Sequence, residues 1–444
     1  MTDRRDLRAL VDRLPVSPRF WRSPLRGTWL TSLLGAVLLA GVPLLFVTGL
    51  LSYAAYNPDL SPLNDKTPDK GLLGFYLFAW PTRPYWLYRV TQGVHVTVGV
   101  ALIPVLLAKL WSVIPRFFAL PPVRSVSQAL DRLSLLFLVG GGLFTFLTGV
   151  LNVQLDYVFP GSFYRLHFYG AWVFMSAFAA HAALRIPGTV RILRQHGGPL
   201  AYIRSTTARP PVRTASDTMA SDTTASDDLA APDPAPPTLS RRGLAALVGG
   251  GSMLLLLTTA GQSIGRPLRR TALFAPHGGG DPGDGPNGFQ INKPAALAGV
   301  THRQTGEAWR LVVTGPRGQV RLARADLLAM PQHTAALPIA CVEGWSTENQ
   351  HWRGVRLRDL AALVGYEPDD APDVLVESLQ LDGSFRRAAL RHNQVRDADS
   401  LLALQVNGAD LSPDHGYPAR VIVPAAPGVL NTKWVARLSF GRVA

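Results

Sequence analysis

The stretch "PIACVEGWSTENQHWRGV", residues 338–355, contains the only cysteine in a chain of 444 residues. A solitary thiol cannot form an intrachain disulfide, which excludes a small secreted scaffold held together by disulfide bonds. Three interpretations of Cys341 remain: an inert buried residue, a nucleophile, or a soft thiolate ligand of a metal. The rest of the sequence has to decide among them.

The composition indicates a membrane protein. Hydrophobic residues make up 47% of the chain and charged residues only 17%, whereas soluble domains carry roughly 25% charged residues. The formal net charge is +14, but the basic residues are mostly arginines that are scattered or stand beside apolar runs. No dense basic tract is present, so the charge favours a membrane setting and argues against nucleic-acid binding.

Five apolar stretches reach the length of about 20 residues that a helix needs to cross a bilayer. Four of them lie in the first half of the chain and one follows much later. They cover roughly residues 29–51, 88–114, 133–155, 163–186 and 243–264. The sequence therefore predicts a four-span helical membrane domain over 29–204 and a fifth span over 241–265.

The positive residues of the connecting segments predict the orientation. Cytoplasmic segments of membrane proteins are enriched in Lys and Arg. Three such segments occur: the arm 1–28, with seven arginines, the segment between spans two and three, and the segment after span four. In the other two loops, acidic residues offset the basic ones. We therefore expect a multi-pass protein of the cell membrane with a cytoplasmic arm.

Residues 205–240 consist largely of Pro, Ala, Ser, Thr and Asp, which predicts a disordered cytoplasmic linker. The fifth span begins with "SRRGLAALVGG", residues 240–250. This start is either an ordinary basic anchor or a twin-arginine export signal, which serves domains that are already folded. In both cases the chain beyond residue 265 is expected outside the cytoplasm, with 266–288 as a Gly/Pro-rich tether.

Residues 289–444 have the sequence pattern of a separate domain. Short β-rich runs such as "WRLVVTG", "DVLVESLQL", "LLALQVNG", "ARVIVPA" and "WVARLSF" alternate with turn signals at Asp382-Gly383 and Asn407-Gly408. Two short helical patches, residues 324–330 and 357–363, separate them. The sequence predicts an α+β fold that is rich in sheet.

Several motifs of this domain occur together and in order. "IACVEGWS", "HWRGVRLRDLAALVG", "LLALQVNGADLSPDHGYPARVIVP" and "NTKWVARL" resemble the molybdopterin domain of the sulfite oxidase family. The resemblance implies that Cys341 is the catalytic residue and supplies the thiolate that binds molybdenum. A thiolate is a soft ligand, and metal binding itself removes the thiol proton.

The same resemblance implies which residues contact the pterin and its phosphate. Arginine suits phosphate because its planar guanidinium can donate two parallel hydrogen bonds. Lys293 stands where the family usually has histidine. The implied cofactor-binding residues are Asn292, His415, Arg420, Asn431, Thr432 and Lys433.

Three further expectations concern the surroundings of the site. Trp345, Trp352 and Trp434 are expected in the core or the pocket wall. A substrate oxyanion would need cations near the metal, and the candidates, which could equally be surface residues, are Arg353, Arg356, Arg386 and Arg387. The domain shows no match to the family's C-terminal dimerisation module. In this it resembles the shorter bacterial members of the family, which are partnered by a membrane cytochrome b.

Three histidines lie within the apolar stretches: His95, His167 and His181. A histidine in a membrane helix is either a functional residue or a hydrogen-bonding residue of the bundle. His95 and His167 lie at matched depth, and the arrangement of histidines over 29–204 resembles a membrane cytochrome b, which implies bis-histidine ligation of haem b near the outer face. His181 follows His167 on the same helix face and is a candidate ligand of a second haem. Lys109 stands at the level of its partner, and one haem or two stays open.

The sequence as a whole indicates a molybdenum-cofactor oxidoreductase that exchanges electrons, through haem b, between quinones in the lipid and an external oxo-transfer substrate. A sulfite-like oxyanion or a sulfoxide is expected as substrate, and the direction of electron flow stays open. One alternative is a haem-only electron carrier whose outer domain is a non-catalytic binding module. Another keeps the molybdenum but has no haem, with the spans acting as an anchor.

Overall fold

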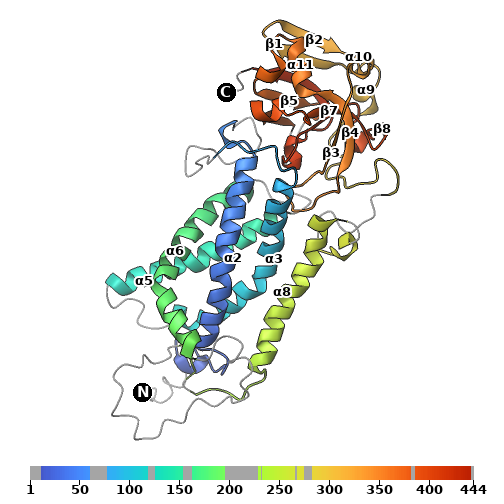
Figure 1. The fold of residues 1–444 in the computed structure, drawn as a ribbon. Coiled ribbons are helices and arrows are strands. Elements are labelled where there is room, and N and C mark those ends of the chain that lie inside the picture. The colour runs from blue at the N-terminus through green and yellow to red at the C-terminus, as the bar shows by residue number, and fades with distance from the viewer. Residues whose placement is uncertain are drawn as a thin grey trace, which may run out of the picture. The chain divides into compact units, whose positions relative to one another are not determined.

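The computed structural model describes residues 12–60, 78–118, 126–153, 163–195, 229–231, 233–265, 268–274, 283–381 and 386–441. These residues form a set of long helices and a domain of two sheets (Figure 1). Most of the expected linker, residues 205–228 and 232, lies outside the described residues, as do part of the basic arm, part of the tether and the expected turn at Asp382-Gly383.

Each of the five predicted apolar stretches is a helix, because an uninterrupted run of apolar residues can satisfy its backbone groups only within itself when water is absent. Four described helices are long and apolar enough to cross a membrane, and α6 would be the fifth if its two parts, bent by 56°, count as one span. The helices are α2 Thr28–Ala55, α3 Leu87–Val113, α5 Val126–Asn152, α6 Phe163–Gln195 and α8 Arg241–Ile264, with the short α4 Pro115–Phe118 after α3.

The chain divides into two compact units, and the division cuts through every long helix. The first unit contains residues 1–43, 101–144 and 170–254, and the second contains 44–100, 145–169 and 255–444. In the first unit, Lys109 Nζ donates to the carbonyl of Thr31 at 2.5 Å, and Arg26 lies over the ring of Trp111. The second unit holds the sheet domain and the candidate site residues described below, except His181.

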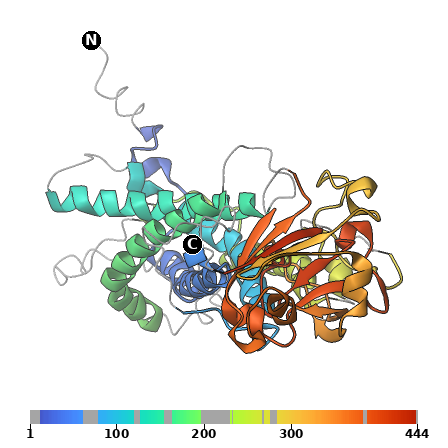
Figure 2. The ribbon, with the colours of Figure 1, turned by 90° about the horizontal axis from the view of Figure 1, so that it is seen from above.

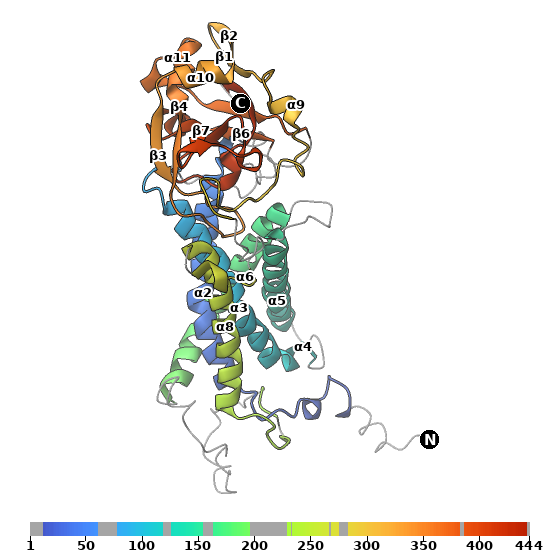
Figure 3. The ribbon, with the colours of Figure 1, turned by 90° about the vertical axis from the view of Figure 1, so that its right-hand side faces the viewer.

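The C-terminal domain contains two sheets (Figures 2 and 3). Its described residues form ten strands. One sheet has the order β2-β1-β10-β5-β6, and the other has the order β3-β4-β7-β8 with β9 paired to β7. Only the pairing of β1 with β10 is parallel among the described strands. The strands are β1 Leu311–Gly315, β2 Gly318–Leu322, β3 His333–Leu337, β4 Gln350–Arg356, β5 Val374–Ser378, β6 Arg387–Leu390, β7 Leu401–Val406, β8 Ala409–Asp410, β9 Arg420–Ile422 and β10 Val435–Phe440.

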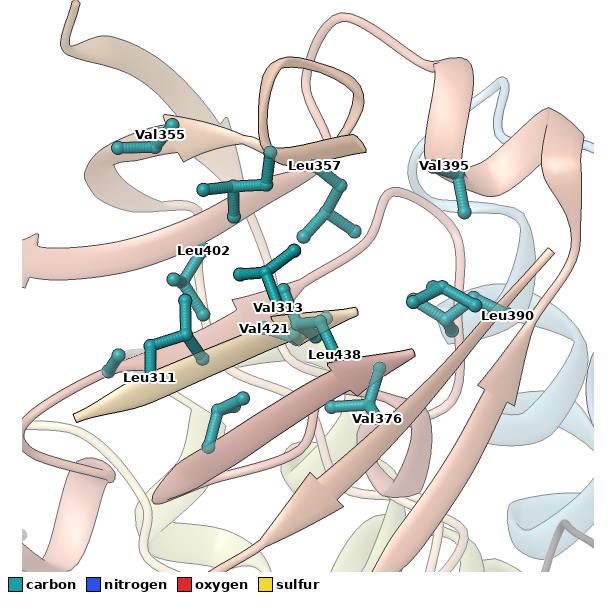
Figure 4. Close-up of a cluster of buried hydrophobic side chains, with 14 of the residues drawn as sticks. Leu311, Val313, Val355, Leu357, Val376, Leu390, Val395, Leu402, Val421 and Leu438 are labelled. Carbon is teal, nitrogen blue, oxygen red and sulfur yellow. The ribbon is translucent and has the colours of Figure 1, made fainter. Parts of the chain in front are cut away.

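The main core of this domain lies where the two sheets and α11 meet. Leu311 of β1 and Leu438 of β10 are fully buried with Leu402 of β7 and Leu357 of α11 (Figure 4). Burying a leucine side chain contributes about 1.5–3 kcal/mol. The short helices that complete the domain are α9 His302–Thr305, α10 Arg324–Ala329, α11 Leu357–Leu363 and α12 His392–Arg396.

Within the second unit, the segment between α2 and α3 contacts the sheet domain by polar side chains. Asn57 Nδ2 donates to the carbonyl of Ala389 at 3.1 Å. Trp80 Nε1 donates to the carbonyl of Ala425 at 2.8 Å. Arg83 forms an ion pair with Asp399 at 2.8 Å. The sheet domain and the adjoining ends of the long helices are therefore joined by specific contacts.

Candidate functional site

Cys341 lies in the connection between β3 and β4. Its side chain is buried, and its backbone N–H donates to the carbonyl of Trp345 at 2.8 Å, which closes a tight loop. Burial raises the pKa of the Cys341 thiol well above its ordinary value, and the nearby Glu343 carboxylate raises it further. The thiol is therefore neutral by itself, and a bound metal ion would supply the positive charge that stabilises the thiolate.

The Cys341 side chain lines a pocket. Five of the residues that the sequence nominated meet here: Cys341, Asn292, His415, Arg420 and Lys433. They come from the start of the domain, the β3–β4 connection, the segment before β9, the first residue of β9 and the segment before β10. Trp345 also lines the pocket, as expected for a wall residue. The remaining lining residues are Gln290, Ile291, Ile339 and Gly428.

Arg420 is the buried cation of this pocket. Only 5% of its surface is exposed. Its Nη1 donates to the carbonyl of His415 at 3.3 Å, its guanidinium lies 5.6 Å from the ring centre of Trp352, and its Nε is buried without a partner. Because burial penalises the charged form, the pKa of Arg420 falls to about 9. An anion in the pocket would satisfy the free N–H and reverse this shift.

Lys433 adds a second cation. Its Nζ donates to the carbonyls of Lys293 at 2.5 Å and of Asp414 at 3.0 Å. Burial lowers the pKa of Lys433 well below its ordinary value, and the charge of Arg420 lowers it further. Among the described residues, neither Lys433 nor Arg420 forms an ion pair with a carboxylate. The pocket therefore has an excess of positive charge, which suits a phosphate group.

His415 forms a neutral wall of the pocket. Its ring stacks on Phe289 with a centre-to-centre distance of 3.8 Å, and its Nε2 lies 2.9 Å from the carbonyl oxygen of Asn287. Burial, followed by the charge of Arg420, lowers the pKa of His415 to about 4. The neutral ring donates from Nε2 to Asn287 and is held in place by that bond and by Phe289.

Two other nominated residues lie apart from the pocket lining. The carboxamide oxygen of Asn431 accepts a hydrogen bond from the backbone N–H of Val423 at 2.8 Å, so it supports the chain after β9. Thr432 is buried, and its hydroxyl has no partner. None of the four arginines considered for substrate binding lines the pocket. Arg356, for example, donates to the carbonyl of Ala398 at 3.2 Å.

Gln290 is a pocket residue that the sequence reasoning did not single out. It lines the pocket, and its buried side-chain oxygen has no hydrogen-bond partner. Such an acceptor is costly to bury unless a ligand supplies a donor. The motif "FQINK" that nominated Asn292 also contains Gln290, so the same motif could have indicated both residues.

A second candidate site joins His95 of α3 to His167 of α6. Their ring centres lie 6.0 Å apart, and the ring planes are nearly perpendicular, at 84°. Nδ1 of His95 lies 3.0 Å from the carbonyl oxygen of Leu45, and Nδ1 of His167 lies 2.9 Å from that of Thr145. Such bonds fix the ring orientation and leave Nε2 as the nitrogen for a metal.

Two glycines border these rings. A Cβ on Gly49 would lie 3.1 Å from Cε1 of His95, and one on Gly149 would lie 3.0 Å from Cε1 of His167. His181 belongs to the other unit. No group of three or more His, Cys, Asp or Glu side chains forms a metal site in the described part of the chain. A metal at either candidate site would therefore need ligands from a cofactor.

Comparison with known proteins finds matches to the C-terminal segment of the chain. Residues 298–443 match the model of the family "oxidoreductase molybdopterin binding domain". Mitochondrial sulfite oxidase of Mus musculus is 33% identical over 156 residues, which are 30% of this chain and 29% of that protein. The uncharacterized oxidoreductase YuiH of Bacillus subtilis is 30% identical over 139 residues, 30% of this chain and 65% of that protein.

Among solved structures, the sulfane dehydrogenase SoxCD from Paracoccus pantotrophus has 27% sequence identity and a TM-score of 0.27, over 30% of this chain and 38% of that chain. This chain thus spans less than a third of the length of the sulfite oxidase it matches. The family match includes the loop of Cys341 and seven of the ten pocket-lining residues, whereas Gln290, Ile291 and Asn292 precede it. The C-terminal segment of the chain is a sulfite oxidase-like, molybdopterin-binding oxidoreductase domain.

Proposed function

We propose that the chain is a membrane-bound molybdenum-cofactor oxidoreductase that exchanges electrons between the quinone pool and an oxo-transfer substrate outside the cytoplasm, through haem b. The observation that carries this proposal is that the Cys341 thiol lines the same pocket as the buried Arg420 and the partly buried Lys433. A soft metal ligand and a receptor for phosphate in one pocket are the two features that a molybdopterin needs.

The residues present fit the molybdenum cofactor. Cys341 would bind the metal, Arg420 and Lys433 would neutralise the phosphate, and the unpaired acceptor of Gln290 would receive a donor from the pterin. The cofactor supplies two-electron oxo-transfer chemistry at the metal. The protein's share is to hold it in a dry pocket where the neutral ring of His415 adds no competing charge.

The histidine pair likewise fits a haem. Nε2 of His95 and Nε2 of His167 would hold the haem iron, because Nδ1 of each ring faces a backbone carbonyl. The separation of His95 and His167 is 6.0 Å, and the two bordering glycines leave their rings uncovered by side chains at those positions. The haem supplies a one-electron relay. The carbonyls of Leu45 and Thr145 hold the proton on Nδ1 of each ring.

The long helices support the membrane setting. They carry large apolar side chains on their surfaces, such as Val47, Leu107, Leu136, Leu147 and Leu254, each more than 40% exposed. A soluble protein rarely leaves so much apolar surface uncovered, whereas lipid covers it at no cost. Quinones dissolve in the same lipid, so the membrane would contain both the helices and the electron source or sink.

The overall reaction balances in either direction. A quinol gives up two electrons and two protons. Reduction of a sulfoxide takes up two electrons and two protons and yields a sulfide and water. In the opposite direction, sulfite and water yield sulfate, two protons and two electrons, which a quinone accepts.

The test is to purify the full chain in detergent and measure molybdenum, haem absorbance and turnover with methionine sulfoxide or sulfite in one preparation. We expect about one molybdenum per chain and a haem b spectrum that His95→Ala and His167→Ala each abolish. His181→Ala is the matched control and should keep at least one haem. A chain with haem but no molybdenum would instead be an electron carrier with a binding module. A chain with molybdenum but no haem would mean that the helices serve only as a membrane anchor.

A further inference from the structure

The loop of Cys341 is held from outside its own domain. We define the Cys341 loop as residues 341–346, between β3 and β4. Inside the loop, the N–H of Gly344 donates to the carbonyl of Cys341 at 3.1 Å. Gly344 has φ +90°, a left-handed conformation that glycine adopts without strain. The loop is therefore a compact turn that has the candidate metal ligand at one end.

Three successive carbonyls of the Cys341 loop accept hydrogen bonds from side chains of the long helices. Gln92 Nε2 of α3 donates to Val342. From the end of α8, Gln262 Nε2 donates to Glu343 at 3.4 Å and Ser263 Oγ donates to Gly344 at 2.5 Å. Three donors in a row leave this part of the loop backbone little freedom to move.

Ser346 completes the attachment to α8 from the loop side. Its N–H donates to the carbonyl of Gln262 at 3.0 Å, and its Oγ donates to the carbonyl of Ser263 at 2.9 Å. Arg89 of α3 in turn donates to the carbonyls of Ser263 at 3.1 Å and Ile264 at 2.8 Å. The last carbonyls of α8, which lack partners inside the helix, are thus used to join α3, α8 and the loop.

The contact with α3 flanks the histidine at residue 95. Gln92 is three residues before His95 and Val96 directly follows it, and both touch the loop: a Cβ on Gly344 would lie 2.8 Å from Cβ of Val96. Gln92 and Ser52 are buried, and Ser52 Oγ donates to Oε1 of Gln92 at 2.5 Å, which fixes the carboxamide. One turn of α3 therefore links the candidate haem ligand to the candidate molybdenum-ligand loop.

From these contacts we infer that α3 and α8 form a clamp on the Cys341 loop, with Gln92 as the positioning residue that couples the molybdenum site to the haem bound by His95. The inference rests on the proposed function. Each transfer moves one electron between the molybdenum site and the haem. Two successive transfers complete the two-electron exchange with a quinol or quinone. No part of the chain has to travel between the centres, and α8 acts as a structural part of the redox unit in addition to any role as an anchor.

The test compares Gln92→Leu with Arg83→Gln in the full chain in detergent. Arg83→Gln is the matched control because its ion pair with Asp399 also joins the helix side to the sheet domain but does not touch the Cys341 loop. Loss of one hydrogen bond of about 1.4 kcal/mol corresponds to about a tenfold change in the opening of the loop. We expect the amides of Gly344 and Ser346 to exchange hydrogen about tenfold faster in Gln92→Leu and at the wild-type rate in Arg83→Gln.

A second readout separates coupling from damage to the molybdenum site. In Gln92→Leu, the oxidation of pre-reduced haem by methionine sulfoxide, or the reduction of oxidised haem by sulfite, should slow about tenfold. Turnover with a soluble dye as electron donor or acceptor should stay within about twofold of the wild type, as should the molybdenum and haem contents. Ser263→Ala removes a different loop contact and should change exchange and haem kinetics in the same direction.

Unchanged amide exchange and unchanged haem kinetics in both Gln92→Leu and Ser263→Ala would overturn the clamp. An equal fall in dye-driven turnover would overturn the coupling role and place Gln92 with the molybdenum site. If the wild type lacks haem or molybdenum, the proposed function fails by itself, and the amide exchange of residues 344 and 346 still decides whether the helices hold the loop.

Discussion

At the scale of single residues, the pocket depends on a thiol and two cations that the fold keeps from water without acidic partners. The motifs implied Cys341, Arg420 and Lys433 through their resemblance to the sulfite oxidase family, and all three side chains line one pocket. They did not predict that Asn431 would bond the backbone at Val423. Whether a polar residue faces a ligand or its own backbone depends on side-chain direction, which a motif does not record.

We predict that Cys341→Ser abolishes molybdenum-dependent turnover while the fold and the haem spectrum remain. The hydroxyl is close to the thiol in size, so the change should cost about 1 kcal/mol of stability, but it is a harder and much less acidic ligand. Turnover with sulfite and methionine sulfoxide, molybdenum content and haem absorbance are measured on one preparation. Near-normal turnover of the variant would remove Cys341 from the mechanism.

His415 predicts a pH dependence of stability in protein without the cofactor. Its pKa is about 4 when folded and near 6.5 when unfolded, so below pH 6.5 the unfolded chain gains a proton that the folded chain does not. The free energy of unfolding therefore falls as pH falls from 6.5 toward 4, by up to about 3 kcal/mol in total. Urea unfolding followed by tryptophan fluorescence at pH 7 and pH 5 measures this loss.

The variant His415→Gln removes the titrating group and should flatten that pH dependence, whereas His302→Gln, at an exposed position, should leave it as in the wild type. A wild-type slope in His415→Gln would mean that other groups cause the acid sensitivity.

At the scale of elements, helices and strands formed by apolar runs could be predicted from the sequence, whereas strands rich in polar residues could not. The expected helical patches appear as α10 and α11, and the turn at Asn407-Gly408 appears between β7 and β8, with φ of 51° and 85°. The strands β2, β3, β4, β6 and β8 were not predicted. β2, for example, carries Gln319 and Arg321 on exposed positions, and pairing with β1 rather than local preference makes it a strand.

The contacts of α3 with the Cys341 loop could not be predicted from the sequence either. Gln92 and Val342 are 250 positions apart, and no local pattern connects them. The matched depth of His95 and His167 could be predicted, because position along a membrane helix can be counted from its boundary. Their approach to 6.0 Å also needs α3 and α6 to present the right faces, which only the packed helices reveal.

The small residues beside the histidines give a prediction about α5. Gly149→Leu should lower the haem content of the purified chain about tenfold, because a side chain there would press on the ring of His167, and overpacking of this kind costs about 1–3 kcal/mol. Gly140→Leu on the same helix is the control, since a Cβ at that position meets nothing within 4 Å. The pyridine haemochrome spectrum per protein gives the content. Equal haem in both variants would argue against a haem at His167.

At the scale of the whole molecule, five long apolar helices and a two-sheet domain in one polypeptide predict one arrangement across the membrane. The arginine-rich segments should face the cytoplasm and the sheet domain should lie on the other side. Single cysteines introduced at residue 220 and residue 302 in a Cys341→Ser background test this with a membrane-impermeant thiol reagent on intact cells. We expect labelling at 302 only, and labelling at 220 instead would reverse the topology.

The position of β10 sets the order in which this domain can be made. It follows every other described strand along the chain, yet it lies in the middle of its sheet, between β1 and β5. While the ribosome is still adding these residues, the edges of β1 and β5 have no strand between them, and Lys433, just before β10, is not yet in its place. The sheet closes only after synthesis has passed residue 440, so a cofactor that needs Lys433 would be loaded only after translation of the domain.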